Sequence, residues 1–352
     1  MTTSRTTTAD GAQPAAVAGG PLHGGLWRVS GAALLVVAVL ALAACSQEPA
    51  TPIAPSSTSR GQGQGRVSVQ RGAFFAGEGS GVVASKRYPG VLWAIRDSGP
   101  STANRPRAAL YAYRQVDGQL ADLVHGKKFA VFPISGAVNT DWEDIARDDQ
   151  GNIWVADIGD NFCVRGSAAL LKVREPDPST DREATLLATY RFRYPDPAPK
   201  CRVQNAESLF LVDGVPYLID KTTRSAVYRL PSLDPGRTVV LKRLAYLTPP
   251  ASGGVANLSG ADLSADRRRL AVENYASVFV YESAHPSLRG DALVRDLVGH
   301  PPKWTVELGC TACPTASQVE GIAFAYGTYD LDMLAENHDV WYVPAAAYDH
   351  PG

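Results

Sequence analysis

Carboxylate side chains recur at comparable places in segments that lie far apart along the chain. Glu143, Glu207 and Glu320 each stand at the start of a short run of strand-forming residues, and further acids follow the next such run. Calcium takes about six to eight oxygen ligands from carboxylates, amides and water, so a fold that brought these acids together could bind it. As metal ligands we predict Glu143, Asp144, Asp157, Asp160, Glu207, Asp262 and Glu320, and as further ligand-binding residues Asp97, Lys221, Glu273, Glu336 and His338.

Tight turns offer a competing interpretation for each of these residues taken singly. Asp, Asn and Gly are the residues that turns require at the ends of strands, and the segment Asp157-Ile158-Gly159-Asp160-Asn161 fits such a turn. Glu is not a turn former, yet it recurs at three comparable places. The set as a whole therefore favours binding more than any single member does.

The segments that carry these acids share one form, which indicates an internal repeat. They cover 80–83, 143–146, 207–210, 261–264 and 320–323. Subtraction gives spacings of 63, 64, 54 and 59 residues between the positions taken as equivalent, Val82, Ile145, Leu209, Leu263 and Ile322. Long amphipathic helices are absent, and short β-branched and aromatic runs separated by Gly, Pro, Asp and Asn are typical of an all-β fold.

Each repeat continues with a similar series of strands. Second strands are expected at 91–95, 152–156, 216–219, 269–272 and 331–334, third strands at 110–113, 170–173, 227–230, 278–281 and 340–343, and fourth strands near Phe129, Tyr190, Leu241 and Trp304. Four strands per repeat, arranged radially, make a β-propeller. We predict a single propeller of five four-stranded blades, with six as the alternative if two short blades have been merged. An N-terminal strand at 66–70 would supply the missing outer strand of the last blade and close the ring. A β-sandwich is the other all-β interpretation, but it would not demand this period.

Propeller geometry would place the acids together. In each blade the inner strand begins, and the second strand ends, at the same face of the disc. Residues at those positions would crowd the mouth of the central channel, where like charges raise one another's pKa unless a cation intervenes. This convergence is the basis of the predicted calcium site.

The N-terminal region predicts export and lipid attachment. Arg28 is followed by an apolar run at 29–44, which is shorter than the ~20 residues of a membrane-spanning helix and typical of a signal peptide. Leu42-Ala43-Ala44-Cys45 resembles a bacterial lipobox, in which the cysteine receives a lipid and becomes the mature N-terminus. An ordinary transmembrane anchor is the alternative. We therefore predict a lipoprotein signal peptide at 1–44, lipidation at Cys45, a disordered Ser-, Pro-, Gly- and Gln-rich linker at 45–65 and the propeller at 66–352.

The net charge and the predicted export of the chain limit the kinds of partner that we expect. The formal net charge is −1, and no basic run interleaved with aromatic residues is present, so nucleic acid is not an expected partner. The expected partners are the membrane, through the lipid anchor on the extracytoplasmic face, and a small molecule or envelope protein. We expect a monomer.

Four further cysteines favour disulfides, because their number is even and the chain is predicted to be exported. The expected pairs are Cys163 with Cys201 and Cys310 with Cys313. The spacing of Cys310 and Cys313 could also form half of a zinc site, but no second pair of ligands accompanies it.

The segments Asp141-Trp142-Glu143-Asp144-Ile145-Ala146 and Trp154-Val155-Ala156-Asp157-Ile158-Gly159-Asp160-Asn161 resemble a pattern in exported bacterial propellers, and more loosely the phytase and esterase-like phytase propellers. The resemblance implies that Glu143, Asp144, Asp157, Glu207, Asp262 and Glu320 bind calcium ions that hold phosphate and activate water. Those enzymes pair the acids with basic residues, for which only Lys221, Arg96 and Arg224 are candidates here.

Three functions remain open at this point. The first is a lipid-anchored binding or scaffolding propeller, the second a calcium-dependent hydrolase of a phosphoester or lactone, and the third a structural lipoprotein. No GxSxG, HExxH, Walker loop or GxGxxG in a dinucleotide-binding context is present. Since fold alone does not choose between these functions, the site must.

Overall fold

The structure is a computed structural model that describes residues 67–70, 72–74, 77–97, 108–195, 203–250, 257–285, 287–308 and 318–349. All of them belong to one unit, 59–352. The predicted signal peptide at 1–44, Cys45 and the predicted linker at 45–65 lie outside the described residues. Among the residues described, no helix combines the length and the apolar character needed to cross a bilayer.

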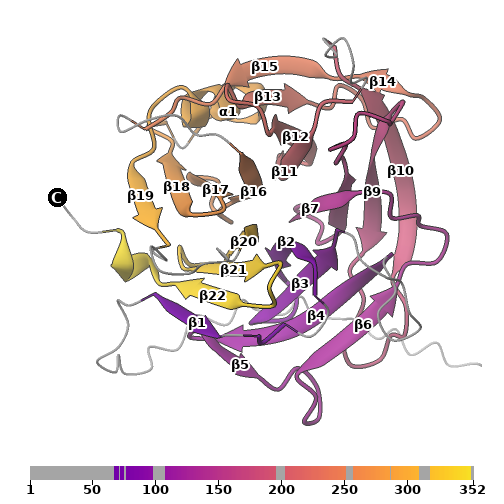
Figure 1. Ribbon diagram of the computed structural model, residues 1–352, viewed down its shortest axis with the longest axis vertical. Coiled ribbons are helices and arrows are strands. Elements are labelled where there is room, and N and C mark those ends of the chain that lie inside the picture. Colours follow the sequence, from indigo (N-terminus) through magenta and orange to yellow (C-terminus); the bar gives the residue numbers. More distant parts are fainter. Residues whose placement is uncertain are drawn as a thin grey trace, which may run out of the picture. The chain divides into compact units, whose positions relative to one another are not determined.

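The short apolar runs form strands, and the strands form five antiparallel sheets around one axis (Figure 1). The innermost strands are β2 (Gly79–Ala84), β7 (Trp142–Arg147), β11 (Ala206–Val212), β16 (Leu258–Leu263) and β20 (Val319–Phe324). The second strands are β3 (Val91–Arg96), β8 (Ile153–Asp157), β12 (Val215–Asp220), β17 (Arg269–Asn274) and β21 (Leu331–Ala335). The third strands are β4 (Ala109–Val116), β9 (Ala168–Arg174), β13 (Ala226–Arg229), β18 (Ser277–Glu282) and β22 (Val340–Val343). The outer strands are β6 (Phe129–Pro133), β10 (Thr185–Arg193), β15 (Lys242–Tyr246), β19 (Trp304–Glu307) and β1 (Ser68–Gln70).

The ring closes through its two ends, as predicted. Strand β1 pairs antiparallel with β22, with Val69 opposite Trp341, and so completes the last blade. The prediction of an all-β propeller with five blades and an N-terminal closing strand is therefore confirmed. Two short strands are additions to the pattern: β5 (Gln119–Ala121) extends the first blade, and β14 (Val239–Val240) pairs in parallel with β10 of the second blade.

Every inner strand carries a β-bulge near its start, where one residue is left out of the pairing with the second strand. The bulged residues are Gly81, Glu143, Glu207, Ser259 and Glu320. A bulge re-aims the side chains beside it. Three of the five bulged residues are glutamates, so the same backbone feature presents three carboxylates.

The bulges correct two of the five equivalences read from the sequence. Counted from its bulge, Ile145 corresponds to Val83 rather than Val82, and to Ala261 rather than Leu263. In the fourth blade the inner strand begins at Leu258, three residues before the predicted segment. The error arose because Ala261 was aligned with the glutamates and Asp262 with Asp144, whereas the residue at the bulge is Ser259.

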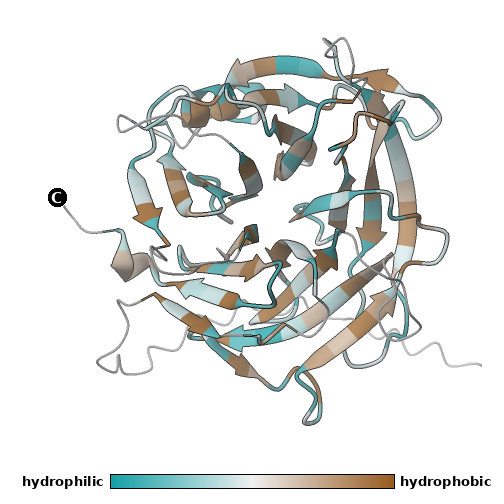
Figure 2. Ribbon diagram, in the orientation of Figure 1, coloured by the Kyte–Doolittle hydropathy of each residue, from teal (hydrophilic) through white to brown (hydrophobic). Residues whose placement is uncertain are grey.

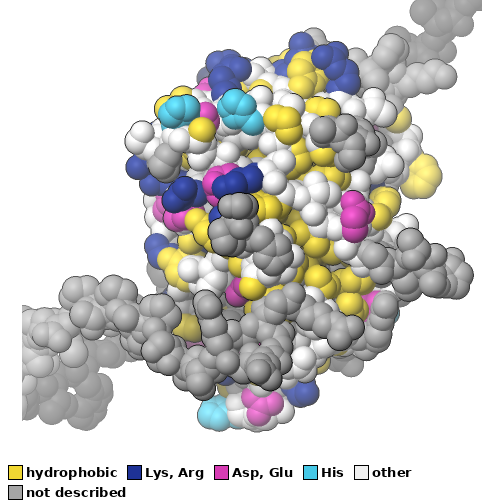
Figure 3. Space-filling view, turned by 90° about the vertical axis from the view of Figure 1, so that its left-hand side faces the viewer, with side chains coloured by type: hydrophobic (Ala, Val, Ile, Leu, Met, Phe, Trp, Pro, Cys, Tyr) yellow, Lys and Arg dark blue, Asp and Glu magenta, His cyan; other side chains and the backbone are white. Residues whose placement is uncertain are grey.

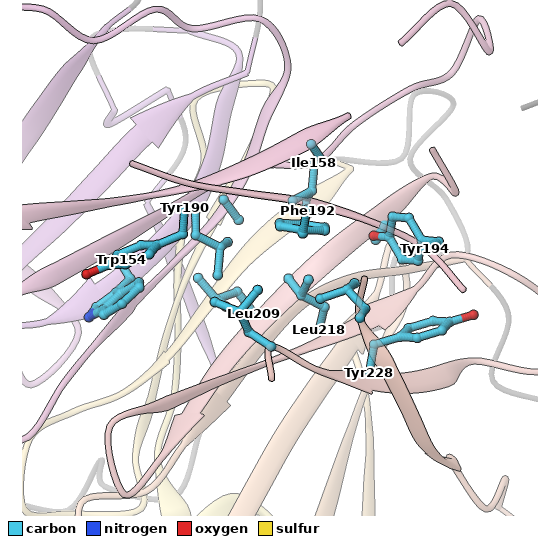
Figure 4. Packing of buried hydrophobic residues seen from close by; sticks show 14 of the residues in the cluster. Trp154, Ile158, Tyr190, Phe192, Tyr194, Leu209, Leu218 and Tyr228 are labelled. Carbon is cyan, nitrogen blue, oxygen red and sulfur yellow. The ribbon is translucent and has the colours of Figure 1, made fainter. Parts of the chain in front are cut away.

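The core lies between neighbouring sheets. One cluster joins the second and third blades: Trp154 stacks on Tyr190 with ring centroids 5.1 Å apart, and Leu209 and Leu218 pack from the next blade (Figure 4). The outer strands mix polar and apolar residues, because only one of their faces is covered (Figure 2). Burial between blades therefore fixes the angular position of each sheet.

Two helical elements were also not predicted: the short 3-10 helix η1 (Ala345–Ala347) and the helix α1 (Gly290–Val298) between β18 and β19. In α1, residues Leu293, Val294 and Leu297 are buried in a cluster shared by the third and fourth blades, and Asp291 accepts a hydrogen bond from Tyr217 Oη at 2.8 Å. The side of the ring near β19 shows Lys and Arg interspersed with Asp and Glu over apolar groups (Figure 3). Among the described residues in this view, Lys and Arg do not form one block separate from Asp and Glu.

Candidate functional site

The site is built at the end of the ring axis where the inner strands begin. Antiparallel pairing brings the start of each inner strand to the end of its second strand, for example Trp142 opposite Asp157 and Val319 opposite Ala335. The five inner strands face one another around the axis (Figure 1). Their starts therefore share one end, which we call the mouth.

Six carboxyl groups of the mouth act electrostatically on one another. We call this set the acidic mouth: Asp97, Asp141, Glu143, Glu207, Glu320 and Glu336. Its three bulged glutamates are nearly inaccessible, with Glu143 and Glu207 each 3% exposed and Glu320 5% exposed. The three residues come from the second, third and fifth blades, so the ring closure is what makes them neighbours.

The pKa of each glutamate in the acidic mouth is raised. Burial is the main cause for Glu143, and the charges of Glu207 and Asp141 add to it. Burial raises the pKa of Glu320 to about 10, with Glu336 and Glu207 adding repulsion and Lys221 opposing it. The pKa of Glu207 is also raised by burial, although Lys221 pulls it down. The mouth therefore crowds carboxyl groups, and of its three bulged glutamates the described residues place only Glu207 in an ion pair, with Lys221.

Lys221 is the cation that the described residues place in the acidic mouth. Its ammonium group forms an ion pair with Glu207 and lies 2.5 Å from Tyr275 Oη. Burial lowers the pKa of Lys221, but the neighbouring Glu207 outweighs it and the net shift is upward. Lys221 is thus committed to one of the acids.

A second ring of oxygen-bearing side chains was not recognised as a set in the sequence, although Asp141 itself was expected near the mouth. The residue directly before each inner strand is an acid or an amide: Glu78, Asp141, Asn205, Asn257 and Gln318. Three members of this ring contact the acidic mouth. Asn205 Nδ2 lies 3.4 Å from Glu207 Oε1, and Gln318 Nε2 lies 2.5 Å from Glu336 Oε2. Carboxylate oxygens of Glu78, Asp97 and Glu336 lie within 4.8 Å of one another. The recurrence of Asx or Glx at this position was the available signal.

Asp157 and Asp160 serve the loop that follows β8. Asp157 accepts the Asp141 N–H at 3.0 Å and forms an ion pair with Arg165 at 2.9 Å. Asp160 accepts the N–H groups of Val164 and Arg165. This is the turn-stabilising role of Asp, and it occupies both groups without placing them in the acidic mouth.

Two other predicted residues lie deeper along the axis, and a third lies at its far end. Asp144 accepts N–H groups from Ile145, Leu209 and Ala261. Glu273 is fully buried on β17. Asp262 accepts the Phe324 N–H at 2.8 Å at the ends of β16 and β20. Burial raises its pKa to about 7, and Arg147 opposes the shift.

His338 contacts the backbone beside Glu78 and is not part of the acidic mouth as defined, and three of the four cysteines after Cys45 lie outside the described residues. His338 Nδ1 lies 2.8 Å from Phe74 O, and its ring packs on Gly77. Cys163 lies in the loop after β8, whereas Cys201, Cys310 and Cys313 are outside the described residues. The two disulfide pairings stay predictions.

Comparison with known proteins adds little to this geometry. No family model and no curated protein matches the chain. Among solved structures, the crystal structure of the Cps50 (Swd1) β-propeller domain of Myceliophteria thermophila is similar at 10% identity and a TM-score of 0.39, covering 79% of this chain and 99% of that one. A likeness at this level carries no functional argument. The sheet order and the ring closure establish by themselves that the chain folds as a five-bladed β-propeller.

Proposed function

We propose that this chain is a lipid-anchored β-propeller of the cell envelope that binds calcium, and with it a ligand or protein partner, at the acidic mouth. The observation that carries the proposal is the convergence of Glu143, Glu207 and Glu320 from three blades onto one end of the axis. Buried acids that repel one another destabilise a fold unless a cation or a donor compensates them. Lys221 compensates one of them.

Calcium suits the chemistry of this donor set. The acidic mouth and the ring before the inner strands offer carboxylate and amide oxygens from every blade, which is the mixture that calcium prefers. Gly159 supports the arrangement, because a Cβ there would overlap the Glu143 carboxylate and lie 2.5 Å from Asp141 Oδ2. Glycine thus leaves room for two acids to approach one another.

Calcium titration tests the proposal. Calorimetry on the purified full-length protein in detergent should show binding, and calcium at about 100 times Kd should stabilise the fold by roughly 2.7 kcal/mol. The double variant Glu143→Gln, Glu207→Gln should lose this stabilisation, while Asp149→Asn, which removes an exposed acid at the other end of the axis, should keep it. Absence of binding at millimolar calcium would sink the proposal.

The anchor is tested separately. Cys45→Ser should abolish incorporation of a labelled fatty acid and release the protein from the membrane fraction. Retention of the label in that variant would contradict lipidation at Cys45, and would leave the calcium site unaffected.

A calcium-dependent phosphoesterase or lactonase is less well supported, because the three basic candidates already have partners within the protein. Lys221 is ion-paired with Glu207. Arg96 Nε donates to Gly77 O at 3.0 Å, and Arg224 lies over the Tyr246 ring at 4.0 Å. Chelator-sensitive turnover of a generic phosphoester or lactone, lost in the same double variant, would nevertheless favour the enzyme over the binding protein.

A further inference from the structure

Below the acidic mouth, two fully buried carboxyl groups face the same stretch of the axis. Asp144 on β7 and Glu273 on β17 are both 0% exposed. Asp144 follows the bulged residue of its blade, and Glu273 pairs with Gly260, which follows the bulged Ser259 of the fourth blade. The two residues therefore stand at the same level, one step deeper than the bulged glutamates. We call them the axial pair.

The two members of the axial pair differ in how they are satisfied. Asp144 accepts N–H groups from Leu209 at 2.7 Å, Ile145 at 2.8 Å and Ala261 at 3.2 Å. Glu273 has a hydrogen-bond partner at neither carboxyl oxygen. Burial raises its pKa, and Asp144 is the charge that adds to the shift. No basic group offsets the charge of Glu273 within the described part of the chain.

The backbone leaves space at this carboxyl. A Cβ at Gly260 would lie 2.8 Å from Glu273 Oε1 and 3.4 Å from the Glu320 carbonyl oxygen. The adjacent Ala261 N–H is one of the groups that holds Asp144. Gly260 thus lies beside the Glu273 carboxyl and directly before the residue whose N–H binds Asp144, and the Glu320 carbonyl lies close to it.

We propose that the axial pair binds a calcium ion inside the ring, separate from any ion at the acidic mouth. A protonated Glu273 would still have a buried donor and a buried acceptor without partners, which folded proteins rarely tolerate. A hard cation with oxygen ligands satisfies both oxygens and neutralises the charge. The Glu320 carbonyl and water complete its coordination. This site does not depend on the proposed function of the mouth.

Metal content and calcium titration test the axial site. Wild-type protein should bind two distinguishable classes of calcium, one of which resists dialysis because it is enclosed. Glu273→Gln should lose the enclosed ion and keep the other, and the double variant Glu143→Gln, Glu207→Gln should show the reverse. Gly260→Ala keeps both carboxyls but fills the space, and should weaken the enclosed site at least tenfold. Asp332→Asn is the matched control, since it removes a buried carboxyl on β21 that has no place in the axial pair.

Several results would overturn the axial site without deciding the mouth. If the Glu273→Gln variant has the same calcium content as wild type, Glu273 does not bind an ion. Loss of the infrared band of a protonated carboxylic acid in this variant would then show that Glu273 carries a proton instead. If Glu273→Gln does not fold, calcium binding by Gly260→Ala that equals the binding by wild type would overturn the axial site instead. A single class of ion in the wild type, lost entirely in the mouth variant, would leave the proposed function standing and this inference wrong.

Discussion

The acidic mouth differs from a pair of acids at the far end of the ring axis in how the carboxylates are compensated. At the far end, where the inner strands finish, Asp148 and Glu282 have partners of their own: Asp148 binds Lys172 at 2.9 Å and also Trp154 Nε1 and Asn152, and Glu282 binds Arg269 and Lys303. Burial raises the pKa of Asp148, but these donors outweigh it and the net pKa is lowered. The pKa of Asp148 and of Glu282 is thus lowered at this end, although burial raises that of Asp262 to about 7, whereas the pKa of every glutamate in the acidic mouth is raised.

The difference separates acids that hold the fold from acids that are left for a ligand. A structural carboxylate is surrounded by donors that the chain itself supplies, as at Asp148. The glutamates of the acidic mouth share one lysine, so the fold places them together at a cost in stability. Such a cost is commonly retained where binding requires it.

The largest expected effect is the loss of stability when Asp148 at the far end is replaced. Asp148→Ala leaves the Trp154 indole N–H, the Asn152 amide and the Lys172 ammonium without their acceptor. The free energy of unfolding should fall by on the order of 3 kcal/mol, measured by denaturant titration. Asp149→Ala, at the exposed neighbouring residue, should change the free energy of unfolding little. Equal losses of stability in the two variants would show that Asp148 has no special structural role.

The contribution to the pH dependence of stability should differ in sign between Glu320 at the mouth, whose pKa is raised, and Asp148 at the far end, whose pKa is lowered. The pKa of Glu320 is about 10 in the fold against an ordinary value of 4.5, so the folded chain keeps a proton that the unfolded chain releases. Its contribution is therefore complete below pH 4.5 and is lost as the pH rises toward about 10. Glu320→Gln should stabilise the calcium-free protein at pH 8 by on the order of 1–2 kcal/mol. Thermal melting across this range checks it, and a wild-type slope that persists in the variant would contradict it.

The lysine of the mouth should weaken calcium binding. Lys221→Met removes a positive charge beside Glu207 and Glu320, so calcium should bind about tenfold more tightly, equivalent to ~1.4 kcal/mol. Calorimetry measures the change. Lys172→Met, which breaks an ion pair at the far end, should lower stability and leave calcium affinity unaltered. Weaker binding in Lys221→Met would mean that the lysine positions Glu207 for the ion.

The smallest expected effect concerns the approach of two acids over Gly159. A methyl group there would push the Glu143 carboxylate away from Asp141, so Gly159→Ala should weaken calcium binding about threefold, or ~0.7 kcal/mol. Gly166→Ala is the matched control in the same loop, because a Cβ at 166 meets no atom within 4 Å. Identical affinities in the two variants would exclude this role for Gly159.

Most of the fold could be predicted because its strands are local and its repeat is visible. The strands predicted at 91–95 and 340–343 became β3 and β22, and the closing strand was recognised because the last repeat lacked one. The fourth inner strand was misplaced because Ser259 gives no acidic signal at the bulge. The helix α1 was missed because it is short and interrupts the spacing.

The candidate site was predicted in part, for a physical reason. Glutamates could be recognised, because Glu has no turn-forming role that would explain its recurrence. Aspartates could not be sorted, since Asp157 and Asp160 bind loop N–H groups, Asp262 lies at the far end and Asp144 lies inside the axis. Which N–H groups and cations a given Asp meets depends on the blades that become its neighbours, and that information is not local.

The pairing of β1 with β22 also determines how the molecule would respond to a mechanical load. Tension applied through the chain before Ser68 reaches the ring at a strand held by only three residue pairs, Ser68 to Tyr342, Val69 to Trp341 and Gln70 to Val340. Peeling that strand away would strip the fifth blade of its outer edge, while β2 and β20 would still pack the first blade against the fifth. Tension on the chain before Ser68 would therefore separate β1 from β22 before it disturbed any other pair of strands.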